Sequence, residues 1–288
     1  MKQRIHLLII DPQNDFCDLP DTYCPRDPLT GDFVTPALPV AGAHADMLRL
    51  ASLIRAGSEG LTGITVTLDS HHRLDIAHPT FWKRGDGSAL RPFTPITAMQ
   101  VRAGEFQPRD PAALPRTLAY LDELEARGRY TLMVWPVHCE IGSWGHNLHA
   151  DVRAACNGWE DLQLQVVEMV AKGENPWTEH YSAVMAEVPD LQDAHTQINK
   201  DLLMRLDGAD AILIAGEASS HCVKATTEHI VANLPGGHPE RITLITDCMS
   251  PVEGFADQHV SFLDDMRSRG VRLATAMEVL SVLRTNAA

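Results

Sequence analysis

A cysteine follows a strand-like run and a turn in the second half of the chain. Residues 211–215 (AILIA) are all apolar, Gly216 interrupts the run, and a helix-compatible segment extends from Cys222 to about Leu234. This pattern is typical of a buried parallel strand, a turn and a helix. A helix N-terminus favours a thiolate, and free N–H groups in such a turn could hold an oxyanion. Cys222 is therefore a candidate nucleophile, with an inert core cysteine as the alternative.

Other side chains that can do chemistry also follow strand-like runs. They are Asp11, Asp69, His71, His138 and Lys172. Taken singly, an aspartate there is most often a turn former, and a lone histidine or lysine has no special meaning. Because the carboxyl ends of parallel strands meet at one edge of a sheet, we expect all of them to converge with Cys222.

One set of these residues suits nucleophilic catalysis. A thiol has a reference pKa of about 8.5, so it needs a base or a positive field to attack at neutral pH. Asp11 could accept the thiol proton. Lys172 could hold both the carboxylate and the thiolate in place.

A second set suits a metal ion. Asp69, His71 and His138 offer one carboxylate and two imidazoles, which fit zinc or another first-row divalent ion. On an extended chain, Asp69 and His71 point to the same side. His78 is a candidate fourth ligand, whereas His72 is expected to point the other way.

The elements that must position these residues alternate between strands and helices. This order predicts an α/β fold with a doubly wound, mainly parallel six-stranded sheet and helices on both faces. The predicted strands are residues 6–10, 63–68, 130–135, 162–170, 211–215 and 241–246, with a short seventh at 271–274. The predicted helices are residues 43–55, 116–126, 144–156, 194–206, 222–234, 256–269 and 276–283. We expect one domain, residues 1–288.

Composition limits the partners. The formal net charge of −14 argues against a nucleic acid or an anionic membrane as a partner. No apolar run reaches the roughly 18 residues that a membrane span needs, and the start of the chain does not resemble a signal peptide. Six cysteines in 288 residues favour reduced thiols in a cytoplasm. We expect a homo-oligomer with a small-molecule substrate.

The motifs occur in an order found in a known family. They are Asp11-x-Gln13-Asn14-Asp15-Phe16, Asp69-x-His71, Trp135-Pro136-x-His138-Cys139, Lys172-Gly173 and Gly216-x-Ala218-x-x-x-Cys222-Val223. With them the chain resembles the nicotinamidase branch of the isochorismatase-like cysteine hydrolases. The resemblance covers most of the chain outside two insertions, at about 17–39 and 79–129.

The resemblance implies roles for particular residues. It implies a catalytic triad of Asp11, Lys172 and Cys222, and an oxyanion hole made by the amides of Ala218 and Cys222. The peptide bond from Glu217 to Ala218 would be cis.

It also implies a ligand environment. A divalent metal ion, zinc with iron or manganese as alternatives, would be held by Asp69, His71 and His138. Phe16 and Trp135 would flank the substrate ring.

The implied activity is hydrolysis of a small carboxamide with release of ammonia. The first expected reaction is conversion of nicotinamide to nicotinate. The chain departs from the family beside the nucleophile, where Glu217 replaces an apolar residue and Ser219-Ser220 replace Thr-Asp. We expect Glu217 to narrow or polarise the pocket, so another amide or ureido substrate is an alternative. Two further alternatives are attack by metal-bound water, with Cys222 incidental, and a catalytically silent binding protein.

Overall fold

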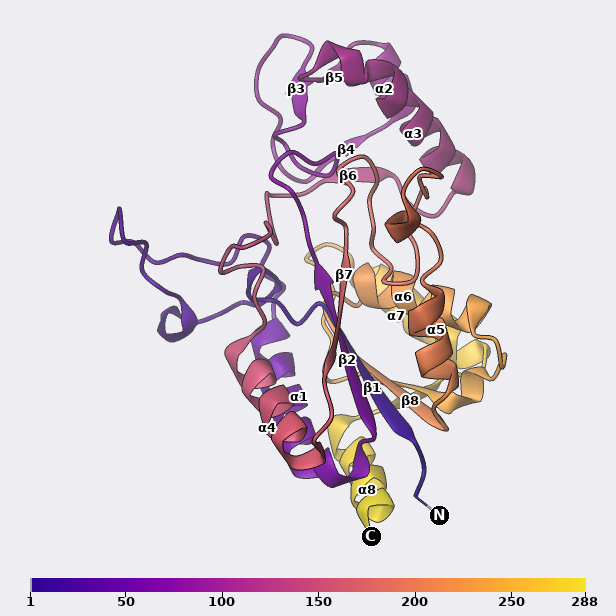
Figure 1. Cartoon of the computed structure of the whole chain (residues 1–288). Helices are drawn as coiled ribbons and strands as arrows, with labels where there is room; N and C mark the ends of the chain where they lie inside the picture. Colours follow the sequence, from indigo (N-terminus) through magenta and orange to yellow (C-terminus); the bar gives the residue numbers. More distant parts are fainter. Residues whose placement is uncertain (1) are drawn as a thin grey trace.

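A six-stranded parallel sheet forms the centre of the computed structural model, which describes residues 2–288 (Figure 1). All five pairs of neighbouring strands run parallel. Because such a sheet is covered on both faces, its central strands need apolar residues on both sides, and every residue of the strand from Ile5 to Ile10 is buried. The spatial order is β10 (Arg272–Ala274), β9 (Ile242–Ile245), β8 (Ala211–Gly216), β1 (Ile5–Ile10), β2 (Gly63–Asp69) and β7 (Glu168–Lys172).

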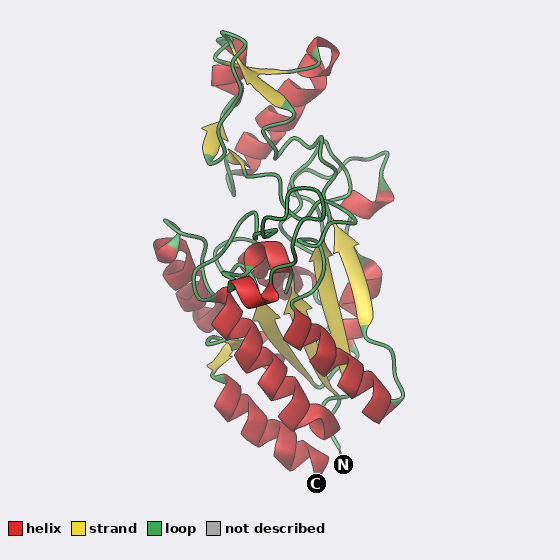
Figure 2. Cartoon of the chain, turned by 90° about the vertical axis from the view of Figure 1, so that its left-hand side faces the viewer, coloured by secondary structure: helices red, strands yellow, loops and turns green. Residues whose placement is uncertain are grey.

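Helices cover the two faces of this sheet, as the sequence pattern predicts. Figure 1 shows α1 and α4 on one side, with α5, α6 and α7 on the other, and Figure 2 views the sheet through the first group. Trp159 of α4 and Met47 of α1 are fully buried between helix and sheet. These helices are α1 (Ala43–Gly57), α4 (Ala150–Gln163), α5 (Lys200–Asp207), α6 (Cys222–Asn233), α7 (Ala256–Ser268) and α8 (Ala276–Ala287), the last of which packs on α1.

The second insertion forms a lobe beyond the carboxyl ends of the central strands (Figure 1). It has its own cluster of buried apolar residues, centred on Trp82, Tyr120 and Leu121. Its elements are β3 (Trp82–Arg84), β4 (Thr94–Ile96), α2 (Ala98–Arg102), β5 (Phe106–Pro108) and α3 (Leu114–Arg127), with β6 (Leu132–Val134) completing a second small sheet.

One predicted strand lies outside the central sheet. Within residues 130–135, the observed strand β6 pairs antiparallel with β4. Leu132 and Val134 are buried in the apolar cluster of the lobe, so the strand satisfies its hydrophobic side chains there. The short strand expected at 271–274 instead pairs with β9 and brings the central sheet to six strands.

Two element boundaries also differ from the prediction around α4. The helix starts at Ala150 rather than 144, because the His149 side chain caps it by accepting a hydrogen bond from the Asp151 amide. It continues to Gln163, so the strand expected from 162 begins only at Glu168. The apolar residue Leu164 misled the prediction, because it is 88% exposed and ends the helix in a left-handed conformation.

Both termini lie at the end of the sheet opposite the lobe (Figure 2). No helix within residues 2–288 has the length and apolar character needed to cross a membrane.

Candidate active site

The turn after β8 positions Cys222 at the carboxyl edge of the sheet. Gly216 permits this turn because its φ is +120° and an added Cβ would lie 2.0 Å from the Ile10 carbonyl oxygen of β1. Cys222 is the first residue of α6 and is only 6% exposed, and this small exposed surface faces a pocket. The strand, turn and helix of the prediction are therefore present.

Three strand ends bring Asp11, Lys172 and Cys222 together. The Lys172 Nζ atom lies 2.9 Å from Asp11 Oδ2, 2.8 Å from Asp69 Oδ1 and 3.6 Å from Cys222 Sγ. Asp11 follows β1 at a positive φ of 44°, a strained region for a residue with a side chain. Thr67 Oγ1 donates a hydrogen bond of 2.5 Å to Asp11 Oδ1 and so fixes the carboxylate.

Burial dominates the electrostatics of this group. Burial raises the pKa of Asp11 even though Lys172 acts to lower it. Burial likewise raises the pKa of the Cys222 thiol well above its usual range, and the Lys172 ammonium only partly offsets this effect. The expected preformed thiolate at the helix N-terminus is therefore not favoured, and the geometry fits a neutral thiol beside an unusually basic carboxylate.

The turn from Gly216 to Cys222 leaves three backbone N–H groups without a backbone acceptor among the described residues, those of Ala218, Ser220 and Cys222. The peptide bond between Glu217 and Ala218 is cis, which confirms the prediction. The carbonyl oxygen of Ala218 accepts from the amides of His221 and Val223, whereas the N–H groups of Ala218 and Cys222 have no backbone acceptor within the described part of the chain. Ala218 and Cys222 both line the pocket, so their amides are available to an oxygen bound there.

Beside the triad lies a cluster of buried imidazoles. His71, His78 and His138 each offer a nitrogen within 4.8 Å of the others. Asp69 Oδ2 lies 3.1 Å from His71 Nε2 and 3.4 Å from His138 Nε2, so the predicted carboxylate borders a cluster whose three members are imidazoles. His72 is exposed and points away, also as predicted.

The surroundings of these imidazoles fit a metal ion. His71 Nδ1 lies 3.1 Å from the Asp75 carboxylate, and His138 Nδ1 lies 2.8 Å from the Pro136 carbonyl oxygen. If each Nδ1 donates to its oxygen, the Nε2 atoms of His71 and His138 keep a free lone pair on the side that faces Asp69. This arrangement is the usual way in which proteins orient histidine ligands.

The pocket over Cys222 is mostly apolar. Its cavity is about 20 Å³, room for roughly one water molecule, so a substrate ring requires the walls to move apart. Phe16 and Trp135 form walls as expected, and the Trp135 indole donates to the Tyr181 hydroxyl at 3.2 Å. The sequence interpretation missed further lining residues, namely Leu38, Glu179, Tyr181, His221 and Val252.

Glu179 is the most polar of the residues missed. It is 4% exposed, its Oε2 atom has no hydrogen-bond partner within residues 2–288, and burial raises its pKa to about 7. It comes from the irregular segment after Lys172, which has no periodicity that could predict its direction. His221, in contrast, precedes Cys222 directly, and this position was a signal that could have identified it.

Glu217, Ser219 and Ser220, which differ from the motif of the resembled family, are not among the residues that line the pocket. The expectation that Glu217 narrows or polarises the pocket is wrong, because its side chain is fully buried and accepts from the Ser250 amide. Ser219 bonds to His259 at 2.8 Å. Ser220 Oγ accepts from the Val252 amide at 3.1 Å and lies 2.9 Å from His221 Nδ1.

This last contact assigns the tautomer of His221. The Ser220 hydroxyl has no other acceptor within residues 2–288, so its proton goes to His221 Nδ1 and the His221 hydrogen resides on Nε2. Burial lowers the pKa of His221 to about 3, so the ring is neutral. The pocket therefore contains a neutral N–H donor beside the nucleophile.

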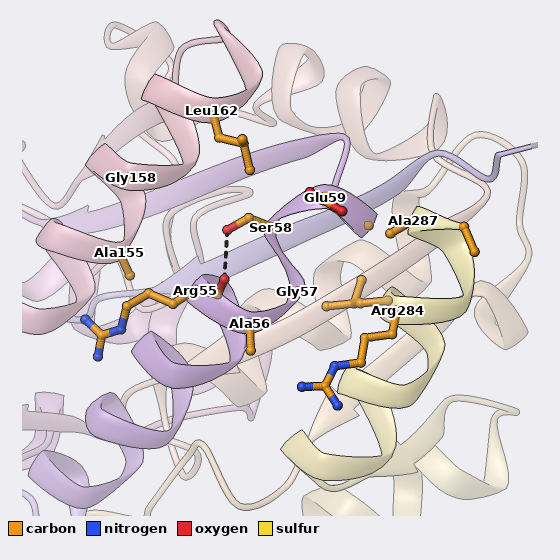
Figure 3. Close-up of a pocket in the computed structure, with 13 residues that line it drawn as sticks. Arg55, Ala56, Gly57, Ser58, Glu59, Ala155, Gly158, Leu162, Arg284 and Ala287 are labelled. Atoms are coloured by element: carbon orange, nitrogen blue, oxygen red, sulfur yellow. Dashed lines mark hydrogen bonds between the residues drawn. The ribbon is translucent and has the colours of Figure 1, made fainter.

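A second cavity lies at the opposite end of the molecule. It has a volume of about 660 Å³ and lies between α1, α4 and α8. Figure 3 shows Arg55 and Arg284 extending from different helices that line it, with the Ser58 hydroxyl bonded to the Arg55 carbonyl oxygen of α1. None of its lining residues is a cysteine, histidine or aspartate, so it lacks the chemistry of the pocket over Cys222.

Comparison with known proteins defines the fold. The chain has the doubly wound α/β fold of solved nicotinamidases and pyrazinamidases. No protein-family model matches the chain, and a search of curated proteins finds no match. An Acinetobacter nicotinamidase/pyrazinamidase has a TM-score of 0.61 at 19% identity, over 96% of this chain and 98% of its own.

Two further solved structures have the same fold and contain ligands. The protein PnC1 of L. infantum, in complex with nicotinate, has a TM-score of 0.55 at 17% identity, over 96% of this chain and 94% of its own. The pyrazinamidase of Pyrococcus horikoshii, in complex with zinc, has a TM-score of 0.51 at 18% identity, over 94% of this chain and 99% of its own. At these identities the similarity establishes the fold.

Proposed function

We propose that this chain is a cysteine-dependent amidohydrolase of the isochorismatase-like superfamily, and that it hydrolyses nicotinamide to nicotinate and ammonia. One observation carries the proposal: Lys172 Nζ lies 2.9 Å from Asp11 Oδ2 and 3.6 Å from Cys222 Sγ at the base of an aromatic pocket. The names of the solved structures with this fold, and the nicotinate bound in one of them, support this substrate class.

In the first half-reaction Asp11 accepts the thiol proton as the sulfur of Cys222 attacks the carboxamide carbon. Because burial raises the pKa of both groups, proton transfer accompanies attack rather than preceding it. The N–H groups of Ala218 and Cys222 stabilise the oxyanion, each worth roughly 10²–10³ in rate. The proton on Asp11 then passes to the departing nitrogen, which leaves as ammonia.

The second half-reaction hydrolyses the thioester. Asp11, again ionised, takes a proton from a water molecule, which attacks the acyl carbon and releases the carboxylic acid and the Cys222 thiol. The sum is one carboxamide and one water converted to one acid and one ammonia. Phe16 and Trp135 hold the ring between them, which turns binding energy into orientation of the carboxamide.

A divalent ion completes the proposed site. Asp69, His71, His138 and His78 would hold it, and this set of one carboxylate and three imidazoles suits zinc, with iron or manganese as alternatives. Zinc in the Pyrococcus structure supports the choice. When bound, the ion supplies a Lewis-acidic contact for a pyridine nitrogen or a water molecule.

A second candidate function is hydrolysis of another amide or of a ureido compound by the same triad. The free carboxyl oxygen of Glu179 favours it, because a substrate with an extra hydrogen-bond donor would satisfy that buried atom. With either substrate we propose one hydrolase domain with two insertions, a cytoplasmic location and a homo-oligomeric assembly.

The test is ammonia release from nicotinamide, benzamide and a small panel of amides and ureido compounds, before and after chelation. We expect nicotinamide to be hydrolysed and to lose more activity on chelation than benzamide, whose ring has no nitrogen to meet the metal. Elemental analysis counts the metal. Protein that is prepared with metal present and still contains none would overturn the nicotinamidase assignment, and no ammonia from any compound would favour a binding protein.

A further inference from the structure

Two buried carboxyl groups meet behind the turn that carries the free amide of Ala218. Glu217, at the end of β8, is 0% exposed, and Asp46, on α1, is 3% exposed. Both side chains bond to the same residue, Ser250, and each carboxyl group acts on the pKa of the other. Two ionised carboxylates held this way in a buried site repel one another, so the arrangement favours one proton on the pair.

The remaining hydrogen bonds show where that proton resides. Glu217 Oε2 accepts from the Ser250 amide at 3.0 Å, and Asp46 Oδ2 accepts from the Ser250 hydroxyl at 2.5 Å. Asp46 Oδ1 accepts from the Arg49 guanidinium. Only Glu217 Oε1 has no donor among the described residues. A proton on Oε1 that is donated to Asp46 satisfies every atom of the pair.

The charges around Glu217 and Asp46 also indicate that the two carboxyl groups hold one proton between them. Burial raises the pKa of Glu217 well above its usual range and raises that of Asp46 as well. Within residues 2–288 the one cation in contact with the pair is Arg49, whose side chain is 46% exposed, and it balances a single carboxylate. The other titratable groups facing the pair are two thiols, two carboxyls and one imidazole, and burial lowers the pKa of the imidazole. These residues are Cys17, Cys248, Asp18, Asp247 and His259.

We propose that Glu217 and Asp46 share one proton and that this acid pair is a positioning device for the active-site turn. Ser250 is the link, since it bonds to both acids and its carbonyl oxygen accepts from the Ser219 amide at 2.9 Å. Val252, two residues further on, lines the pocket. The pair thus connects α1 with the turn that contains the Ala218 amide and with one wall of the pocket. The effect of the pair on turnover rests on the proposed function.

The first experiment measures the proton without any substrate. Because the native pair keeps a proton that the unfolded chain releases above about pH 4.3, the pair by itself should make the unfolding equilibrium constant rise by up to about tenfold per pH unit. Buried neutral histidines such as His78, His180 and His221 act in the opposite sense, so the slope is compared between wild type and variants. Glu217→Gln keeps both hydrogen bonds without a titrating proton, so its slope should be lower by one proton between pH 5.5 and 7.5. Asp46→Asn should lower the slope by the same amount, and it takes the place of Glu217→Gln in the test if that variant does not fold. Parallel slopes for wild type and variants would overturn the shared proton.

The second experiment measures positioning by ammonia release at pH 7.5. Glu217→Leu removes the acceptor of the Ser250 amide, so kcat should fall at least about tenfold with KM within threefold, since an oxyanion donor acts in the transition state. Glu217→Gln should restore kcat. Unchanged kcat in Glu217→Leu would overturn the positioning role. If the wild type hydrolyses no amide, the proposed function fails, and the unfolding slopes still decide whether the proton is shared.

Discussion

Replacing Cys222 by alanine separates the proposed mechanism from attack by metal-bound water. The substitution removes one sulfur atom from a side chain that is 6% exposed and borders an open pocket. Deleting a group of this size costs about 0.5–1.5 kcal/mol of the free energy of unfolding. Lys172 keeps its two carboxylate partners at 2.9 and 2.8 Å, so the ion pairs and the metal ligands should stay in place.

Turnover should respond very differently from stability. Without its nucleophile the site keeps only binding and the two amide donors, so kcat should fall by about 10⁴- to 10⁶-fold. Ammonia release measures this loss, denaturant unfolding measures the stability, and elemental analysis measures the metal.

A matched control is available on another element. Cys156 on α4 is 3% exposed and packs in the core, away from the pocket, so Cys156→Ala should cost a similar stability and leave turnover unchanged. If Cys222→Ala kept more than about one hundredth of the wild-type kcat, a loss far smaller than nucleophile removal causes, the metal-bound water would replace the thiol as the attacking group.

Three further substitutions test other parts of the site. Lys172→Met should cost about 3–5 kcal/mol of unfolding free energy, because it leaves two buried carboxylates without their cation; a smaller loss by denaturant unfolding would mean that one carboxyl is already neutral. His78→Ala should lower the metal content found by elemental analysis, whereas the exposed His72→Ala should not; equal contents would exclude His78 as a ligand. His221→Phe should lower kcat/KM for nicotinamide by about 2- to 12-fold through loss of one neutral donor, and an unchanged value would mean that no substrate atom meets it.

The sequence alone determined the central layers of the fold and the three residues of the proposed triad. Unbroken apolar runs such as those at 7–10 and 211–215 are fully or almost fully buried in a parallel sheet, so local composition suffices to predict them. Since parallel strands align their carboxyl ends, the sequence also predicts that Asp11, Lys172 and Cys222 converge.

The tertiary structure decided what depends on contacts between distant segments. Residues 130–135 have a strand pattern, but only the lobe shows that β6 pairs with β4, since pairing partners are not encoded locally. Glu217 is buried outside the pocket because the Ser250 amide, distant in the chain, offers it a hydrogen bond there. Burial also raises the pKa of Cys222 against the helix dipole, because desolvation of a thiolate depends on everything packed around it, and a sequence pattern shows only the helix.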